Sequence, residues 1–325
     1  MNSTGLPVAV AAPAAILAPS SAQRFDTSIL AGQIAESSQA MYKRDFRAYL
    51  AFAGSFERAM HPSSLARWRS HLANETEYSP RTINRMLAAT KRLMREAAMQ
   101  GYVSHEIAEQ FSQVPGVKVK ALKERQRANN RIMIRPEDMR AICSAPDVST
   151  LAGKMHRALL ATLASSGMRI SEAVTLTLGQ IEYGVDDRGQ FGYTVKVLGK
   201  NETEPSERPL STEAYNLICE WLEARSAAGV DCEHIFTGTG GRGARRPLST
   251  PIAPQSAWEM VKRYAEAVGV PHVKPHDFRR FVGTRLVKER GIRAAQQALG
   301  HKSIETTARN YDLSSLERGM TENLY

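Results

Sequence analysis

The sequence has few cysteines, and their arrangement fits neither a disulfide framework nor a metal site. Its 325 residues contain only Cys143, Cys219 and Cys232, an odd number of widely spaced residues. Cys219 and Cys232 lack the CxxC spacing of a zinc site, and no pair of histidines follows them at ligand spacing. We therefore expect reduced, structural cysteines in a cytoplasmic protein that holds no metal and no other cofactor.

Long apolar runs and nucleotide-binding loops are also missing. No run of about 18 apolar residues occurs, so we expect no membrane span. Residues 5–19 are apolar like the core of a signal peptide, but no basic residue precedes them and three prolines interrupt them. We expect residues 1–25 to form a disordered tail, with an export signal as the alternative. Residues 238–246 are rich in Gly and Arg but match neither kind of nucleotide-phosphate loop.

Positive charge is what the chain has in excess. The formal net charge is +10 and the isoelectric point is about 9.6. Such an excess favours a polyanionic partner, most often nucleic acid, although a merely basic protein is the alternative. Residues 81–127 carry ten Lys or Arg against four Asp or Glu, so much of the excess is concentrated there.

Four helices are expected before residue 113, and the third is the most informative. It begins at Ser79-Pro80, a capping residue followed by a proline in the first turn. Its apolar residues form one face and its arginines form another, which suits a helix lying against a phosphate backbone. An ordinary solvated face is the alternative. The four arginines are Arg81, Arg85, Arg92 and Arg95.

Residues 115–131 have the composition of a basic connector between two domains. Pro115-Gly116 interrupts regular structure, and basic residues follow with Glu124 as the only acid. This connector could close around a duplex, or it could be a solvated tether. We therefore predict a helical DNA-binding domain over residues 26–114, this linker, and a second domain over residues 132–325. The linker residues predicted to contact DNA are Lys118, Lys120, Lys123 and Arg125.

The second domain is predicted to be helical with a small sheet. Pro136 opens one helix with acids in its first turn, and a buried helix over about 153–166 ends at Gly167. Residues 190–198 alternate in polarity and predict a strand, which residues 208–210 continue as an antiparallel sheet. The remainder, from Thr212 onward, reads as mainly helical. The fold class is therefore mostly α in two domains, the second being α+β.

Six side chains of the second domain could together cut a DNA strand without metal or water. A tyrosine can attack the phosphate and keep its energy in a covalent ester. Guanidinium groups can hold the charge that gathers on the phosphate oxygens. Lysine can protonate the leaving oxygen, and imidazoles can donate hydrogen bonds and move protons. The chain supplies these types in the order Arg169, Lys200, His276, Arg279, His301 and Tyr311.

The segments around these residues resemble the motifs of the tyrosine recombinases, the phage integrase family. Residues 166–172 (SGMRISE) resemble its TGxRxSE motif, and residues 197–200 (VLGK) resemble its β-hairpin lysine. Residues 275–279 (PHDFR) are similar to its PHxxRH motif, and residues 299–311 are similar to LGHxxxxTT…Y. Each motif alone is weak, but their order over 143 residues is a strong signal. The resemblance covers residues 27–325, more loosely before Ile132.

The resemblance implies a role for each of these residues. Arg169 and Arg279 would clamp the scissile phosphate, and His301 would donate a hydrogen bond to it. Lys200 would be the general acid for the leaving oxygen, with Lys196 as a rival from the middle of the strand. His276 would assist the proton transfer from Tyr311, which would form a 3′-phosphotyrosyl link. Glu172 and Asp277 would support this site without reacting.

The resemblance also implies the architecture and the partners. The first domain would be a SAM-like core-binding bundle, and the two domains would form a C-shaped clamp on DNA. The target would be double-stranded DNA with an inverted-repeat core site, bound by two protomers and brought into a synapse by four. Strand exchange would pass through a Holliday junction without metal or ATP, in the cytoplasm and associated with the nucleoid.

Two departures from the motifs keep alternatives open. Arg280 stands where the family often has histidine. Tyr311 follows His301 by ten residues, where the family's usual spacing is nine and where this chain has Asn310. One extra residue rotates a helical position by about 100°, so we expect a one-residue bulge or a looser segment before Tyr311. The alternatives to a recombinase are a DNA-relaxing topoisomerase of similar chemistry and a non-catalytic DNA-binding relative.

Overall fold

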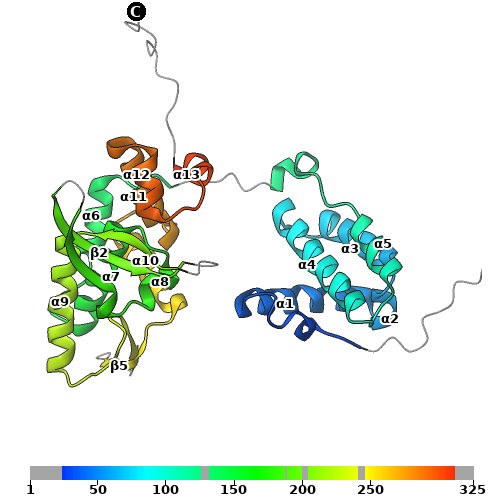
Figure 1. The fold of residues 1–325 in the computed structure, drawn as a ribbon, viewed down its shortest axis with the longest axis horizontal. Coiled ribbons are helices and arrows are strands. Elements are labelled where there is room, and N and C mark those ends of the chain that lie inside the picture. The colour runs from blue at the N-terminus through cyan, green and yellow to red at the C-terminus, as the bar shows by residue number, and fades with distance from the viewer. Residues whose placement is uncertain (1–23, 126–131, 187–188, 200–203, 241–245, 312–325) are drawn as a thin grey trace, which may run out of the picture. The chain divides into compact units, whose positions relative to one another are not determined.

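The structure is a computed structural model in which the chain forms two compact units, Met1–Asn130 and Arg131–Tyr325 (Figure 1). Each unit has its own hydrophobic core. The tail predicted over residues 1–25 lies almost wholly outside the described residues. The described residues are 24–125, 132–186, 189–199, 204–240 and 246–311.

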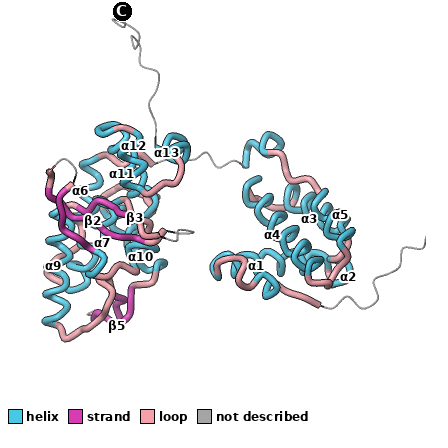
Figure 2. The backbone as a smooth tube through the Cα atoms, viewed as in Figure 1, coloured by secondary structure: helices cyan, strands magenta, loops and turns pink. Residues whose placement is uncertain are grey.

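The described part of the first unit is a bundle of helices, as the sequence predicts (Figure 2). Aromatic side chains of the first helices pack in its core, where the rings of Trp68 and Tyr49 lie 5.1 Å apart between centroids. The Tyr49 hydroxyl donates to the carbonyl of Ala59 at 2.7 Å. The elements are η1 (Thr27–Leu30), α1 (Glu36–Ala53), α2 (Phe56–Ala59), α3 (Pro62–Asn74), α4 (Pro80–Met99), α5 (His105–Gln113) and η2 (Val119–Arg125).

Helix α4 is the central helix of this bundle and begins where the sequence predicts. Ser79 caps it by accepting a hydrogen bond from the backbone N–H of Thr82, and Pro80 occupies its first turn. Its apolar face is buried from Ile83 to Ala98 against α1, α3 and α5. These contacts make α4 the helix that holds the first unit together.

One of the predicted DNA-contacting arginines of α4 forms an ion pair inside the bundle. Arg85 binds the carboxylate of Asp45 from α1 through both terminal nitrogens. The Asp45 side chain is 2% exposed, so Arg85 is the main group that compensates the cost of burying its carboxylate. Arg44 lies 3.8 Å from the same carboxylate and is a weaker partner. The sequence pattern did not reveal this pair because the two residues lie on different helices.

Replacing Arg85 by methionine is expected to destabilise the first unit by about 3 kcal/mol, because it leaves a buried carboxylate without its main partner. Hydrogen exchange of peptides from α1 and α4, measured in the full chain, reports this loss. Arg81→Met is the matched control, since Arg81 is exposed one turn earlier on the same helix. Equal protection in Arg85→Met and Arg81→Met would contradict the structural role of the pair.

The first part of the predicted linker belongs to this bundle. Asn84 of α4 accepts from the N–H of Val117 at 2.8 Å and donates to its carbonyl at 3.0 Å. Val117 and Leu122 pack against the apolar core, and Arg125 donates to the carbonyl of Thr76 at 2.5 Å. Residues 117–125 are therefore folded against the first unit, whereas 126–131 lie outside the described residues.

The second unit is helical with a three-stranded antiparallel sheet, which confirms the predicted fold class. Its core lies between α7, α9 and the sheet, with Trp221 and Phe236 fully buried. The helices are α6 (Pro136–Ser144), α7 (Leu151–Ser166), α8 (Ile170–Val174), α9 (Thr212–Ala227), α10 (Pro254–Ala267), α11 (Pro275–Arg290), α12 (Ile292–Leu299) and α13 (Ile304–Tyr311), with the short η3 (Leu178–Gln180).

The main sheet has the strand order β1 (Ile181–Val185), β2 (Phe191–Val197) and β3 (Ser206–Leu210). The sequence predicts β2 and β3 but not β1. It also missed a second, two-stranded sheet, because β4 (Thr237–Gly240) is rich in glycine and β5 (Arg246–Pro251) contains two prolines, and both residue types are depleted in strands. Among the described residues, no helix is both long and apolar enough to cross a membrane.

Candidate active site

The N-terminus of α11 presents the predicted PHxxRH residues. Asp277 caps this helix by accepting from the backbone N–H of Lys274 at 3.0 Å, and Pro275 occupies the first turn. The other carboxylate oxygen of Asp277 accepts from Arg280 at 3.0 Å. Asp277 thus fixes the turn that carries His276 and Arg279.

Arg279 points into the second unit and ties three segments together. Its side chain is 1% exposed, and it donates to the carbonyl of Gly167 at 2.8 Å and to that of Leu299 at 2.6 Å. A terminal nitrogen also lies 3.0 Å from Nε2 of His301. Burial lowers the pKa of Arg279, while the nearby Tyr311 hydroxyl acts in the opposite direction. Arg279 therefore connects the ends of α7 and α12, which are far apart in sequence.

Arg169 lies at the start of α8 and is held by Glu172. The Glu172 carboxylate accepts from the backbone N–H of Arg169 at 2.8 Å and from its guanidinium at 2.6 Å. The Glu172 side chain is almost fully buried, whereas the Arg169 side chain is 38% exposed. The guanidinium is therefore fixed at one end and open to solvent, as a group that receives an anion must be.

His301 lies between Arg279 and α13, and its contacts define its tautomer. A guanidinium only donates hydrogen bonds, so the Nε2 atom that faces Arg279 must accept. The proton is then on Nδ1, which donates to the hydroxyl of Thr307 at 2.8 Å. Burial, followed by the charges of Arg279 and Arg169, lowers the pKa of His301 to about 4. His301 is therefore a neutral imidazole at neutral pH, oriented from both sides.

Tyr311, the last residue of α13, lies against His301. The two rings are stacked with centroids 5.4 Å apart and planes 20° apart. Tyr311 is 2% exposed and packs with Val282 and Leu299. Gly283 of α11 makes room for it, because a Cβ at this position would overlap the tyrosine ring. The tyrosine, the histidine and Arg279 therefore form one cluster within a single unit.

The extra residue before Tyr311 is accommodated differently from what we expected. Helix α13 runs without interruption from Ile304 to Tyr311, so it contains neither a one-residue bulge nor a looser segment. Asn310, at the family's usual position, instead lines a separate cavity of about 270 Å³ with Phe281 and Arg285. The rotation of one residue brings Tyr311, and not Asn310, onto the face that packs against His301.

The structure says less about the two remaining predicted catalytic residues, His276 and Lys200. His276 is exposed on the first turn of α11, and its pKa is lowered by partial desolvation and by the charges of Arg280 and Arg279. Lys200 lies outside the described residues. Its rival Lys196 donates to Glu182 at 2.6 Å, and this hydrogen bond raises the pKa of Lys196, which makes it a poorer proton donor.

A comparison with protein families identifies the second unit. The profile described as "Phage integrase family" matches residues 133–317, more than half of the chain. The chain belongs to the phage integrase family.

Curated proteins of the same family include two bacterial tyrosine recombinases. The XerD protein of Neisseria meningitidis serogroup A is 32% identical over 178 residues, which are 54% of this chain and 56% of the relative. The chain thus spans little more than half the length of this relative. The XerD protein of Xanthomonas axonopodis pv. citri is 30% identical over 255 residues, 74% of this chain and 73% of the relative.

Solved structures of similar fold include a site-specific recombinase and an integrase. The XerH site-specific recombinase bound to difH substrate has a TM-score of 0.60 and 19% identity, covering 84% of this chain and 75% of that one. A lambda integrase dimer bound to a COC′ core site has a TM-score of 0.56 and 16% identity, covering 90% and 94%. At these identities the likeness shows the shared fold.

The basic residues predicted to bind DNA in this integrase-family chain differ in their surroundings. Arg81 and Arg95 are exposed on α4, while Arg85 pairs with Asp45 and Arg92 donates to Gln33 at 2.9 Å. Arg125 is tied to the carbonyl of Thr76. The residues of the predicted set that are exposed are Arg81, Arg95, Lys118, Lys120 and Lys123.

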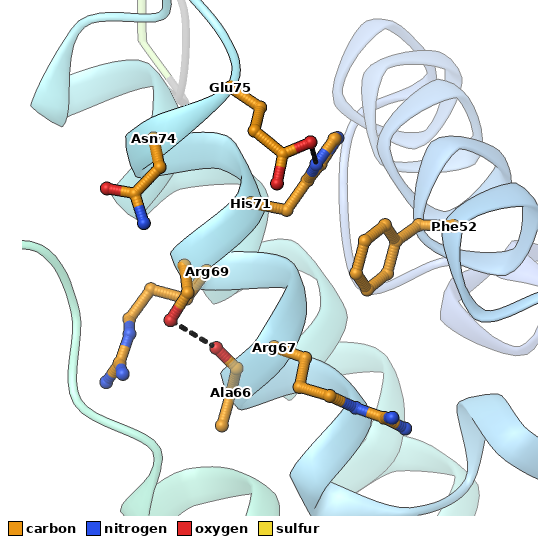
Figure 3. A pocket seen from close by; sticks show the side chains of 8 residues that line it. Phe52, Ala66, Arg67, Arg69, His71, Asn74 and Glu75 are labelled. Atoms are coloured by element: carbon orange, nitrogen blue, oxygen red, sulfur yellow. Dashed lines mark hydrogen bonds and ion pairs between the residues drawn. The ribbon is translucent and has the colours of Figure 1, made fainter.

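A pocket of about 420 Å³ on the first unit adds basic groups that the sequence reasoning missed (Figure 3). It lies between α1 and α3, and Arg67 and Arg69 project from α3 on the side of the pocket away from Glu75 (Figure 3). His71 stacks on Phe52 at 4.9 Å and pairs with Glu75 at 2.9 Å. No periodicity singles these residues out, because their grouping depends on how α1 packs on α3.

Thr307 and Arg208 are the site residues that sequence reasoning missed in the second unit. Thr307 is fully buried and sets the orientation of His301. It belongs to the Thr306-Thr307 motif, which was the available signal. Arg208 is fully buried beside the same corner, and no motif marks it. In the described part of the chain, no cluster of three or more His, Cys, Asp or Glu side chains could hold a metal ion.

Proposed function

We propose that this chain is a site-specific tyrosine recombinase that cuts and rejoins DNA through a 3′-phosphotyrosyl intermediate. The observation that carries the proposal is the cluster of Arg169, Arg279, His301 and Tyr311 in one unit. Two fixed guanidinium groups, an oriented neutral imidazole and a tyrosine are the groups that metal-independent transesterification of a phosphodiester needs. Family membership and the shared fold support the same conclusion.

The reaction follows from the chemistry of these groups. The Tyr311 oxygen attacks phosphorus, a bond to the tyrosine forms, and the bond between phosphorus and the 5′ oxygen breaks. His276 takes the phenol proton, because its lowered pKa leaves it neutral and able to accept at neutral pH. Lys200, the general acid that the resemblance implies, would give a proton to the 5′ oxygen. A 5′ hydroxyl of the partner strand then attacks the phosphotyrosine and reverses these steps.

The phosphate would be held by Arg169 and Arg279, while His301 donates a hydrogen bond to one of its oxygens. Arg169 is open to solvent and can receive the anion directly. Arg279 is enclosed in the free protein, so its guanidinium acts at short range and in a low dielectric, where its charge is least screened. The phosphate would displace the contact between Arg279 and Nε2 of His301. His301 would then carry its proton on Nε2 and donate it to a phosphate oxygen, while Nδ1 accepts a hydrogen bond from the hydroxyl of Thr307.

The proposed partner is double-stranded DNA that carries an inverted-repeat core site. Two protomers would occupy one site and four would form the synapse, in the cytoplasm and on the nucleoid. Exposed basic residues of the first unit and the basic pocket between α1 and α3 would contact phosphates, which are sequence-independent anchors. The binding constant would therefore fall steeply with increasing salt.

Replacing Thr307 by valine is expected to slow DNA cleavage about tenfold, the effect of losing one hydrogen bond of about 1.4 kcal/mol. Valine has the same shape but cannot accept the hydrogen bond from Nδ1, so His301 loses its orientation. Single-turnover cleavage of a nicked site measures the effect. Thr307→Ser keeps the hydroxyl and should restore most of the rate, and Thr306→Val is the exposed control. A normal rate in Thr307→Val would contradict the role of Thr307.

A plasmid assay tests the proposed function against a relaxing topoisomerase. A recombinase should convert a plasmid with two cognate sites into deletion or inversion products and leave a plasmid without a site supercoiled. A topoisomerase of similar chemistry should relax both plasmids without recombinant product. Relaxation without recombinants would overturn the proposal in favour of a topoisomerase.

A further inference from the structure

Strand β3 directs a charged side chain into the body of the second unit. Arg208 lies opposite Val195 in the register of β2 and β3, and both side chains are fully buried. Its neighbours Glu207 and Pro209 are exposed, so they face the other side of the sheet. Arg208 thus occupies a position that would ordinarily hold an aliphatic residue, and burying a guanidinium there is costly.

The guanidinium of Arg208 lies against the corner that carries His301. A Cβ at residue 300 would overlap Cζ, Nη1 and Nη2 of Arg208, so this planar group covers the Cα of Gly300. Gly300 also ends α12 in the left-handed region with a φ of 59°. Nη1 of Arg208 donates to the carbonyl of Glu207 at 3.0 Å, which fixes the group on the strand side. Residue 300 must therefore be glycine for two reasons, its left-handed backbone conformation and the close approach of the Arg208 guanidinium.

The charge of Arg208 also reaches His301. After burial and the charges of Arg279 and Arg169, the charge of Arg208 is the next contribution that lowers the pKa of this histidine. The groups that face His301 are Arg279 and His276 from α11, Arg169 before α8, Arg208 from β3, and Thr307 and Tyr311 from α13.

We propose that Arg208 is a positioning residue for His301, which holds the Gly300–His301 corner against β3 and adds a buried positive charge beside the phosphate site. The effect on DNA cleavage rests on the proposed function, whereas the contact and the charge can be measured on the protein alone. A buried charge near the scissile phosphate strengthens its binding without touching it.

The charge is tested by NMR titration of the full chain with labelled histidine, with His301→Gln used to assign the signal. The wild-type His301 should titrate with a pKa of about 4. Arg208→Met and Arg208→Gln should raise this pKa by about half a unit or more, because a nearby cation is lost. Arg208→Lys should keep it low. Lys196→Met, which removes a cation from the outer face of the adjacent strand, should leave it unchanged.

The fold of each variant is checked by the indole resonance of Trp221, which is hydrogen-bonded to the carbonyl of Ile235 at 2.8 Å. An unchanged His301 pKa in a folded Arg208→Met or Arg208→Gln protein would overturn the proposal. If the methionine variant does not fold, the glutamine variant provides the same comparison.

The contact is tested by a double-mutant cycle. In the wild-type chain, Gly300→Ala is destabilised by two effects, the strain of a left-handed backbone at alanine and the overlap of its Cβ with Arg208. In the Arg208→Met background only the backbone strain remains. The unfolding equilibrium constant should therefore change about tenfold less in the second background. If the effects of Gly300→Ala and Arg208→Met on the free energy of unfolding were additive, the proposed contact between Arg208 and Gly300 would be overturned.

DNA cleavage supplies the last readout and separates the two proposals. Arg208→Met should slow single-turnover cleavage about tenfold, and Arg208→Lys should recover part of the rate. Cleavage at the wild-type rate in Arg208→Met would overturn the contribution to the site. If the wild-type chain cleaves no DNA, the proposed function fails, while the pKa of His301 still decides the role of Arg208.

Discussion

Replacing Tyr311 by phenylalanine is expected to abolish covalent attachment to DNA, with a loss of roughly 10³-fold or more in cleavage rate. Phenylalanine fills the same space against Gly283 and His301, so the fold should be unchanged while the nucleophile is lost. The measurement is the yield of protein–DNA adduct on a nicked suicide substrate. Tyr183→Phe is the matched control, since Tyr183 is 62% exposed on β1, outside the cluster of Tyr311, His301 and Arg279.

A tyrosine moved to the family's usual spacing should not rescue this variant. In the double variant Asn310→Tyr/Tyr311→Phe, the new hydroxyl would point into the cavity lined by Phe281 and Arg285, away from His301. We therefore expect no adduct. Activity in this double variant would show that the segment before Tyr311 changes register when DNA binds, contrary to the helix seen here.

Replacing Arg279 by lysine is expected both to abolish cleavage and to destabilise the second unit by about 2–4 kcal/mol. Lysine cannot reach the carbonyls of Gly167 and Leu299 together, and a buried carbonyl left unpaired costs about 1–3 kcal/mol. Hydrogen exchange of the buried Trp221 indole measures the stability of this unit in the full chain.

Arg169→Lys is the informative comparison for Arg279→Lys. The Arg169 side chain is 38% exposed and its guanidinium is held by Glu172, so its loss should slow cleavage about a hundredfold with little change in stability. Equal stability of Arg279→Lys and the wild type would contradict the role of Arg279 in joining α7 and α12.

Local signals in the sequence were enough to predict the elements that carry the site. Ser79-Pro80 and Gly167 mark a helix start and a helix end, since capping geometry depends on neighbouring residues only. The motifs around Arg169, Arg279 and His301 likewise marked three segments that the structure brings together, namely the start of α8, helix α11 and the end of α12.

Features that depend on packing between distant segments could not be predicted in this way. The ion pair with Asp45 removes Arg85 from the set of α4 arginines that are free to contact DNA. This pair could not be predicted because it depends on how α1 packs against α4. Arg208 escaped notice because its strand pattern gives no reason for a buried charge, which only the approach of Gly300 explains. The spacing of Tyr311 looked like a defect because the counting ignored which face of α13 meets His301.

The central claim is that Tyr311 of this chain attacks DNA. The most direct test is to incubate the intact protein with a library of nicked inverted-repeat sites, digest the adduct, and locate the nucleotide by mass spectrometry. We expect the 3′-phosphate to be attached to Tyr311. An adduct on another residue, or no adduct on any site in the library, would contradict this account.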